Sequence, residues 1–262
     1  MKKTLILSLF LAYNLYANTD DLTSSSERNY FGNNDEKKDM QMSEEDYKKA
    51  LDTYTQKCND NDAKSCASLA YLYDNGLGTK ANKENSIKLY EKACELKDAK
   101  SCSYLGFVYD NGLGIAQNKS KAVELYTKGC ELKDPQGCSN LGISYYRGDG
   151  VEVNMTKSFE WFTKGCELDH GFSCTNLGYM YEYGDGVQKN IEESMKFYEK
   201  ACELEDGMGC SNLGTFYVNG TNILPDFDKA AELFIKACEF GYKEGCEFDT
   251  RLREARLDGE IQ

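Results

Sequence analysis

The sequence predicts an all-α protein in which helical hairpins stack into a solenoid. Three observations carry this prediction: cysteines at a fixed period, glycine pairs that recur with them, and Asn or Asp residues placed to cap two helices in each period. The cysteines alternate gaps of 8 and 28 residues, which gives a period of 36 without one insertion. Such a period is typical of supersecondary units that bury one face against a neighbour. The twelve are Cys58, Cys66, Cys94, Cys102, Cys130, Cys138, Cys166, Cys174, Cys202, Cys210, Cys238 and Cys246.

Residues 1–17 have the layout of a secretory signal peptide. Lys2 and Lys3 precede a short apolar stretch, and Ala17 stands before a polar segment, so we expect cleavage after Ala17. An uncleaved anchor is the alternative, but it would need nearer ~20 apolar residues. Residues 18–42, rich in Asp, Ser, Asn and Lys, are expected to form a disordered lead-in. The protein is therefore expected to be periplasmic or secreted, where cysteines form disulfides.

Each period is expected to hold two helices. In residues 94–129 the first helix begins after Asp98, whose side chain can accept a hydrogen bond from the first turn, and runs to about Asn111. Gly112 follows, where glycine relieves a positive φ after the last turn. The second helix begins at Asn118, another good cap.

The solenoid is expected to cover residues 43–257. Five full units occupy 58–237, a lone helix precedes them, and a truncated sixth unit follows. Residues 258–262 are expected to form a short tail.

The number of cysteines favours one pairing. If Cys66 bonded Cys94 and so on within each hairpin, Cys58 and Cys246 would be left over. Pairing at spacing 8, from Cys58 with Cys66 to Cys238 with Cys246, uses all twelve. Each bond would tie one hairpin to the next, close a loop of about 9 residues and stabilise the fold by roughly 2 to 3 kcal/mol.

Charge and composition exclude several classes of function. The net charge is -13, and removal of the leader with its two lysines makes it -15. Such a chain repels phosphate backbones and anionic lipid heads, so we expect neither nucleic-acid binding nor polybasic docking on a membrane. No Cys stands at the expected cleavage point and no later segment is long and apolar enough to cross a bilayer, so we expect no stable membrane anchor. The single histidine, His170, replaces an Asp cap and is expected in a surface loop. We expect no metal site and no cofactor, because a metal site usually draws on several histidines. A single histidine expected at the surface also argues against a Ser-His-Asp enzyme.

One stripe of the first helices is a candidate binding surface. Counting from the second cysteine of each pair, positions +3 and +7 are always Leu and Tyr and form the core stripe, whereas the opposite stripe is variable or polar. In a helical solenoid that free stripe lines the concave groove. The candidate binding residues are Tyr104, Asn140, Asn176, Asn212, Arg147, Tyr179 and Tyr183.

These residue types suit an extended peptide or a terminal strand as ligand. Asn amides donate and accept at once, Arg147 can take a carboxylate, and the tyrosines supply flat contacts. The alternative is that each Asn caps a neighbouring turn or bonds the next helix. A repeated scaffold contact would produce the same repetition, so both interpretations stay open.

The run Leu-Gly-x-x-Tyr-x-x-Gly-x-Gly at 141–150 and 177–186 resembles the signature of Sel1-like repeats, relatives of tetratricopeptide repeats. With a cysteine pair in every unit and a signal peptide, the chain is similar to the Helicobacter cysteine-rich protein family. Ala70 and Asn222 depart from the pattern, each standing where it has Gly. The resemblance implies a right-handed α/α superhelix. Members of that family have been named as penicillin-binding proteins and β-lactamases, and have been discussed as host-interaction factors.

A dedicated enzyme is not expected. A serine β-lactamase needs Ser-x-x-Lys, and neither this tetrapeptide nor Gly-x-Ser-x-Gly occurs, so no catalytic residue is assigned. The sequence favours a secreted monomer that binds a protein or peptide partner in its groove. The alternative is a β-lactam-hydrolysing or β-lactam-binding protein, as the family naming implies. A passive structural component of the envelope is a third reading.

The sequence Glu152-Val153-Asn154-Met155-Thr156 looks like the extended bacterial glycosylation sequon. Asn154 is also an expected helix cap. The two interpretations are left open.

Overall fold

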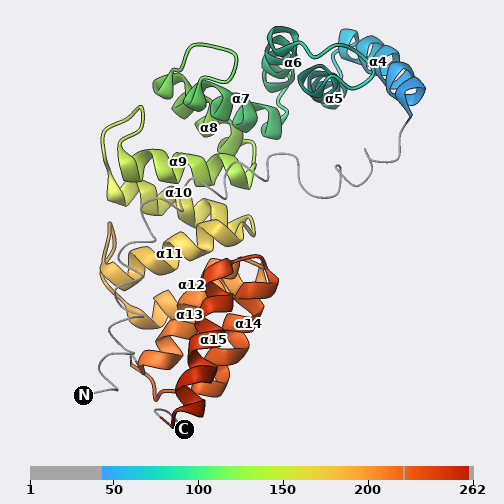
Figure 1. Ribbon diagram of the computed structural model, residues 1–262. Helices are drawn as coiled ribbons and strands as arrows, with labels where there is room; N and C mark the ends of the chain where they lie inside the picture. The colour runs from blue at the N-terminus through green and yellow to red at the C-terminus, as the bar shows by residue number, and fades with distance from the viewer. Residues whose placement is uncertain (1–42, 221, 260–262) are drawn as a thin grey trace. The chain divides into compact units, whose positions relative to one another are not determined.

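The computed structural model describes residues 43–220 and 222–259. The expected signal peptide and lead-in, and most of the expected tail, lie outside the described residues. The described residues form twelve α-helices and no strand, so the all-α prediction is confirmed (Figure 1). None of these twelve helices combines the length and apolar character that a bilayer crossing requires.

The helices divide between two compact units, which we call the N-terminal unit (described residues up to Asn154) and the C-terminal unit (from Met155). The N-terminal unit contains α4 (Glu44–Asn59), α5 (Ala63–Asn75), α6 (Lys83–Glu95), α7 (Ala99–Asn111), α8 (Lys119–Glu131) and α9 (Pro135–Arg147). The C-terminal unit contains α10 (Met155–Glu167), α11 (Gly171–Tyr183), α12 (Ile191–Glu203), α13 (Gly207–Asn219), α14 (Phe227–Glu239) and α15 (Lys243–Leu257).

Within each unit, consecutive helices pack as hairpins and the hairpins stack. Helices α5 and α6, α7 and α8, α11 and α12, and α13 and α14 pack against each other. The first helix of a hairpin also contacts the second helix of the preceding hairpin and, as α7 with α9 and α11 with α13 show, the first helix of the next. Helices α7, α11 and α13 are therefore flanked by at least three other helices, which limits how much of their free stripe reaches solvent.

The expected caps begin the helices. Asp98 accepts from the Ser101 N–H at 2.8 Å, and Asp62, Asp134 and Asp206 cap their helices in the same way. Asn118 accepts from the Lys121 N–H at 3.0 Å at the start of a second helix. These side chains satisfy N–H groups that have no partner within the helix.

Glycine ends the first helices as expected. Gly112 follows α7 with φ 68° in the left-handed conformation, and its N–H donates to the Val108 carbonyl. The second glycine of each pair allows a close backbone approach: a Cβ on Gly150 would lie 2.4 Å from the backbone of Lys119. Asn222 takes this place in one loop with φ 59°, which confirms that an Asn fills the left-handed position there.

Six disulfides join each first helix, and α15, to the helix that precedes it, and the pairing at spacing 8 is confirmed. Their Cα–Cα distances are 4.5–4.8 Å, and no cysteine is free within the described residues. Each bond links the last turn of a second helix to the first turn of the next first helix. The bonds are Cys58–Cys66, Cys94–Cys102, Cys130–Cys138, Cys166–Cys174, Cys202–Cys210 and Cys238–Cys246.

An aromatic ring from the second helix fills the centre of each hairpin. Tyr198 of α12 is fully buried, and Gly178 of α11 leaves the room that its ring needs, since a Cβ there would lie 2.6 Å from it. Gly214 and Phe234 repeat the arrangement in the next hairpin. The leucines at position +3 are buried beside these rings, as expected for the core stripe.

Candidate binding surface

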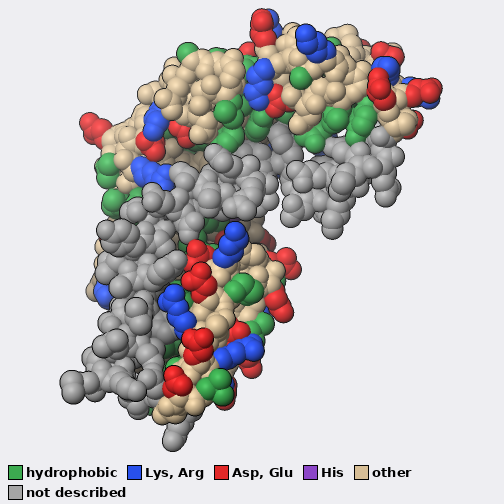
Figure 2. Space-filling view, in the orientation of Figure 1, with side chains coloured by type: hydrophobic (Ala, Val, Ile, Leu, Met, Phe, Trp, Pro, Cys, Tyr) green, Lys and Arg blue, Asp and Glu red, His purple; other side chains and the backbone are tan. Residues whose placement is uncertain are grey.

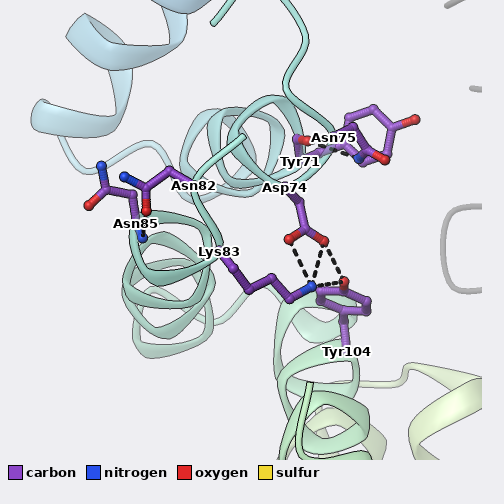
Figure 3. A network of polar contacts seen from close by, with 7 residues as sticks. All are labelled: Tyr71, Asp74, Asn75, Asn82, Lys83, Asn85 and Tyr104. Atoms are coloured by element: carbon purple, nitrogen blue, oxygen red, sulfur yellow. Dashed lines mark hydrogen bonds and ion pairs between the residues drawn. The ribbon is translucent and has the colours of Figure 1, made fainter. Parts of the chain in front are cut away.

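Tyr104 lies between two hairpins rather than on an open surface. Its side chain, on α7, is only 9% exposed. Its hydroxyl donates to Asp74 Oδ2 of α5 at 2.7 Å, and Lys83 Nζ, at the start of α6, lies 2.8 Å from Asp74 Oδ1 (Figure 3). The ring packs 4.7 Å from that of Tyr90. The expected solvent exposure of Tyr104 is wrong, because the preceding hairpin covers this side of α7.

Burial and the Asp74 carboxylate raise the pKa of Tyr104 well above its usual value. The phenol therefore stays protonated and acts as a hydrogen-bond donor. Asp74, Tyr104 and Lys83 form a compact group that joins three helices, and its geometry is that of a hairpin-to-hairpin contact.

Asn140, on α9, is also buried, with 6% of its surface exposed. Gln136, one turn earlier, donates from Nε2 to Asn140 Oδ1 at 3.2 Å. Its expected exposure is wrong; within the N-terminal unit α9 packs against α7 and α8. Arg147, the last residue of α9, is half-buried. Burial raises the pKa of nearby Asp110, and the charges of Lys119 and, more weakly, Arg147 oppose that shift.

The remaining candidates lie in the C-terminal unit, on two first helices that contact each other. Asn176, Tyr179 and Tyr183 belong to α11, and Asn212 belongs to α13. Asn176 Nδ2 donates to the Phe172 carbonyl at 2.7 Å, and both Asn176 and Asn212 are half-buried. The structure thus brings these four together on neighbouring helices of one unit.

Tyr179 and Tyr183 form an aromatic pair that reaches solvent. Their ring centroids are 4.5 Å apart with an interplanar angle of 36°, and Tyr183 is 41% exposed. Positions three and four apart on a helix share a face, which explains how this pair forms. The pair therefore leaves part of an aromatic surface open to solvent at the end of α11.

Glu182, which the sequence did not single out, anchors this region. Tyr198 Oη donates to its carboxylate at 2.8 Å, and burial raises the pKa of Glu182 although the hydrogen bonds from Tyr198 and Tyr183 oppose that shift. Asp74 and Asp110 stand at the same position in earlier units, at +8 from the second cysteine. That recurring carboxylate was the signal that could have identified all three.

His170 occupies the N-cap position of α11, in the short connection after α10, as expected, but it is half-buried rather than fully exposed. Its Nδ1 lies 2.9 Å from Ser173 Oγ, and its side chain makes no capping bond to the backbone. Burial lowers the pKa of His170 to about 4. No group of three or more His, Cys, Asp or Glu side chains in the described part of the chain is placed to hold a metal ion.

The face of the molecule in Figure 2 carries acidic and basic side chains in close alternation over α14 and α15. Arg256 pairs with Asp228 at 2.6 Å, and Arg253 with Asp249 at 2.8 Å. Exposed pairs of this kind contribute about 0–1 kcal/mol each.

Comparison with known proteins identifies the repeats. The Sel1 repeat model matches residues 63–98, 99–134, 135–170, 171–206 and 207–242. The chain therefore belongs to the Sel1 repeat family, and its fold is a stacked, all-helical Sel1 array with six disulfides. No curated protein matches the sequence.

Among solved structures, a Sel1 repeat protein from Oxalobacter formigenes is 25% identical, with a TM-score of 0.72 over 78% of this chain and 82% of that chain. A protective antigen present in uropathogenic Escherichia coli strains is 26% identical, with a TM-score of 0.72 over 79% of this chain and 44% of that one. Helicobacter pylori cysteine rich protein B is 34% identical, with a TM-score of 0.43 over 52% of this chain and 99% of that one.

Proposed function

We propose that this protein is an extracytoplasmic scaffold that binds an extended peptide, or a terminal strand of a partner protein, on the first-helix surface of its C-terminal unit. We call this the α11–α13 surface and define it by Asn176, Tyr179, Tyr183 and Asn212. The observation that carries the proposal is the Tyr179–Tyr183 ring pair, in which Tyr183 is exposed and Tyr179 half-buried, on a helix that contacts α13 and shares its face with Asn176. Aromatic anchors with polar groups around them are typical of binding sites.

Each part of the surface has a separate task. The two rings contribute apolar area at a low cost in side-chain entropy, because a tyrosine has few rotatable bonds. The Asn212 amide can donate to and accept from a peptide backbone at once. Asn176 has committed one donor to the Phe172 carbonyl, which fixes the orientation of its amide toward the ligand.

The compartment follows from the cysteines. Six disulfides, with no free cysteine in the described residues, indicate an oxidising, extracytoplasmic location. Export through a signal peptide cleaved after Ala17, and action as a monomer, are parts of the proposal. No observation on the described residues favours the β-lactam alternative, so peptide binding is the single function proposed.

The test uses the oxidised full-length protein and peptides selected on it from a displayed random library. The double variant replaces each tyrosine by the residue that another repeat has at the same position, so that the fold is kept. Tyr179→Thr copies Thr215 of α13, and Tyr183→Asn copies Asn219. We expect the double variant to lose at least about tenfold in affinity, since truncating a central aromatic anchor costs more than about 1 kcal/mol. Fluorescence anisotropy gives the affinity.

Asn111→Ala is the matched control, because Asn111 holds the position of Tyr183 in the N-terminal unit and is exposed. It is expected to leave affinity unchanged. Peptides that bind the double variant as tightly as the native protein would rule out the α11–α13 surface.

A further inference from the structure

Three Asn-x-Ser/Thr tripeptides occur in the chain, and one of them differs from the others. Two residues before Asn154 stands the acidic Glu152, whereas Ala116 and Tyr217 take this place before Asn118 and Asn219. The tripeptides are Asn118-Lys119-Ser120, Asn154-Met155-Thr156 and Asn219-Gly220-Thr221. Asn-x-Ser/Thr is the general N-glycosylation acceptor, and an acid two residues before the Asn extends it to the form that bacterial oligosaccharyltransferases prefer.

We propose that Asn154 is an N-glycosylation site, modified by a bacterial-type oligosaccharyltransferase during or after export. This proposal does not rest on peptide binding by the α11–α13 surface. It requires only an extracytoplasmic protein, which the six disulfides indicate.

The segment around Asn154 is accessible. Glu152, Val153, Asn154 and Thr156 are all exposed, Val153 by 57%, in the connection between α9 and α10. Asn219 offers a contrast, because it is half-buried and its Oδ1 atom is enclosed by protein. Exposure therefore separates Asn154 from Asn219, and the acidic residue separates it from Asn118.

Capping a helix and carrying a glycan use different atoms of the same side chain. Asn118, the equivalent of Asn154 one period earlier, caps α8 through Oδ1, which accepts from the Lys121 N–H at 3.0 Å. The backbone N–H of Asn154 donates to the Tyr145 carbonyl at 2.9 Å, as that of Asn118 does to Tyr109 at 2.8 Å. Glycosylation takes place on Nδ2, so a cap of this type is compatible with it.

The chemistry needs one co-reactant, an oligosaccharide linked to a polyprenyl pyrophosphate. A bond forms between Asn154 Nδ2 and the anomeric carbon of the first sugar, and the bond from that carbon to the pyrophosphate oxygen breaks. Nδ2 loses one proton to the transferase, and polyprenyl pyrophosphate leaves. No oxidant or reductant takes part.

Met155 and Thr156 lie in the first turn of α10, so the enzyme must receive this turn unwound. The first four N–H groups of a helix have no partner within it, and fraying there breaks few bonds. Modification is thus possible on the folded protein as well as on the chain during export.

The test expresses the full chain, with its N-terminal leader, in bacteria that carry such a transferase and its lipid-linked oligosaccharide. Intact mass of the exported protein counts the glycans. We expect one glycan on the native sequence, none on Asn154→Gln, and loss to background on Glu152→Gln. The variant Ala116→Glu completes the motif before Asn118, and we expect it to gain a second glycan.

Cells without the transferase give the unmodified mass, and a carrier protein with an exposed Glu-x-Asn-x-Thr loop reports that transfer works. Non-reducing mass analysis confirms six disulfides in every variant. An unmodified native chain beside a modified carrier would overturn the proposal. So would an increment that survives Asn154→Gln, or one that Glu152→Gln leaves unchanged.

Discussion

Two hydroxyl–carboxylate pairs of different strength fix buried tyrosines in the N-terminal unit. Tyr104 Oη donates to Asp74 at 2.7 Å, whereas Tyr126 Oη reaches Asp110 at 3.4 Å. A hydrogen bond to a charged acceptor contributes more than a neutral one, and its strength falls with distance. The first pair joins two hairpins, and the second lies within one hairpin.

Tyr104→Phe is therefore expected to lower the free energy of unfolding by about 1 to 2 kcal/mol, with Asp74 keeping its ion pair with Lys83. Tyr126→Phe is the matched control and is expected to cost under about 1 kcal/mol. Urea unfolding followed by circular dichroism measures both. If both variants lose the same free energy of unfolding, the Tyr104–Asp74 hydrogen bond does not stabilise the protein more than the Tyr126–Asp110 bond does.

The low pKa of His170 makes stability depend on pH. Burial lowers this pKa from 6.5 to about 4, so below pH 6.5 the unfolded chain binds a proton that the folded protein excludes. The contribution of the neutral imidazole is fully present above pH 6.5 and is lost as the pH falls through about 4. The buried carboxylates Asp206 and Glu182 have raised pKa values and oppose this trend, which makes a difference measurement necessary.

His170→Asn keeps a polar group at the cap and does not titrate. Between pH 7.5 and 5 we expect the native protein to lose about 1 to 2 kcal/mol more than this variant. Chemical unfolding at the two pH values provides the four free energies. Identical losses would mean that the imidazole titrates normally in the folded protein.

Glycines at position +4 set how closely the two helices of a hairpin approach. A Cβ on Gly214 would lie 2.8 Å from the Phe234 ring. Gly214→Ala gains helix propensity of about 1 kcal/mol but overpacks the core at a cost of about 1 to 3 kcal/mol. The clash is with one side chain, so a smaller residue should relieve it.

We expect Gly214→Ala to destabilise the native protein by about 1 kcal/mol net and to be neutral or stabilising in a Phe234→Leu background. A double-mutant cycle by thermal unfolding measures this coupling. If the two substitutions have additive effects on stability, the cost of Gly214→Ala does not come from contact with the Phe234 ring. It would then come from the backbone conformation.

Most of the fold could be predicted from the period of the sequence, because helix caps, turn glycines and cysteine pairs are all determined by residues close together in the chain. Asp98, Gly112 and the six cysteine pairs were predictable for this reason. Tyr104 and Asn140 were not, since their burial depends on neighbouring hairpins that one helical wheel does not include. The Tyr179–Tyr183 pair could be named from sequence, and Glu182 could have been found from its recurring position, but the bond from Tyr198 to Glu182 could not, because it depends on the packing of α12.

Each of the six disulfides links helices of neighbouring repeats. Removing one should therefore destabilise only the repeats on either side of it. Cys202→Ala with Cys210→Ala removes the disulfide between α12 and α13, and we expect the free energy of unfolding to fall by about 2 to 3 kcal/mol. Cys58→Ala with Cys66→Ala frees only α4. Hydrogen exchange should show faster exchange confined to α4 in the second case and spread over α12 and α13 in the first. The same pattern in both variants would contradict nearest-neighbour stabilisation.

The most direct measurement for the proposed function is where a bound peptide touches the protein. A library-selected peptide carrying a photoreactive phenylalanine is bound to the oxidised protein, cross-linked and mapped by mass spectrometry. We expect cross-links on α11 and α13, at or beside Tyr179, Tyr183 and Asn212. Cross-links confined to the second helices, or to α4–α9, would contradict binding at the α11–α13 surface.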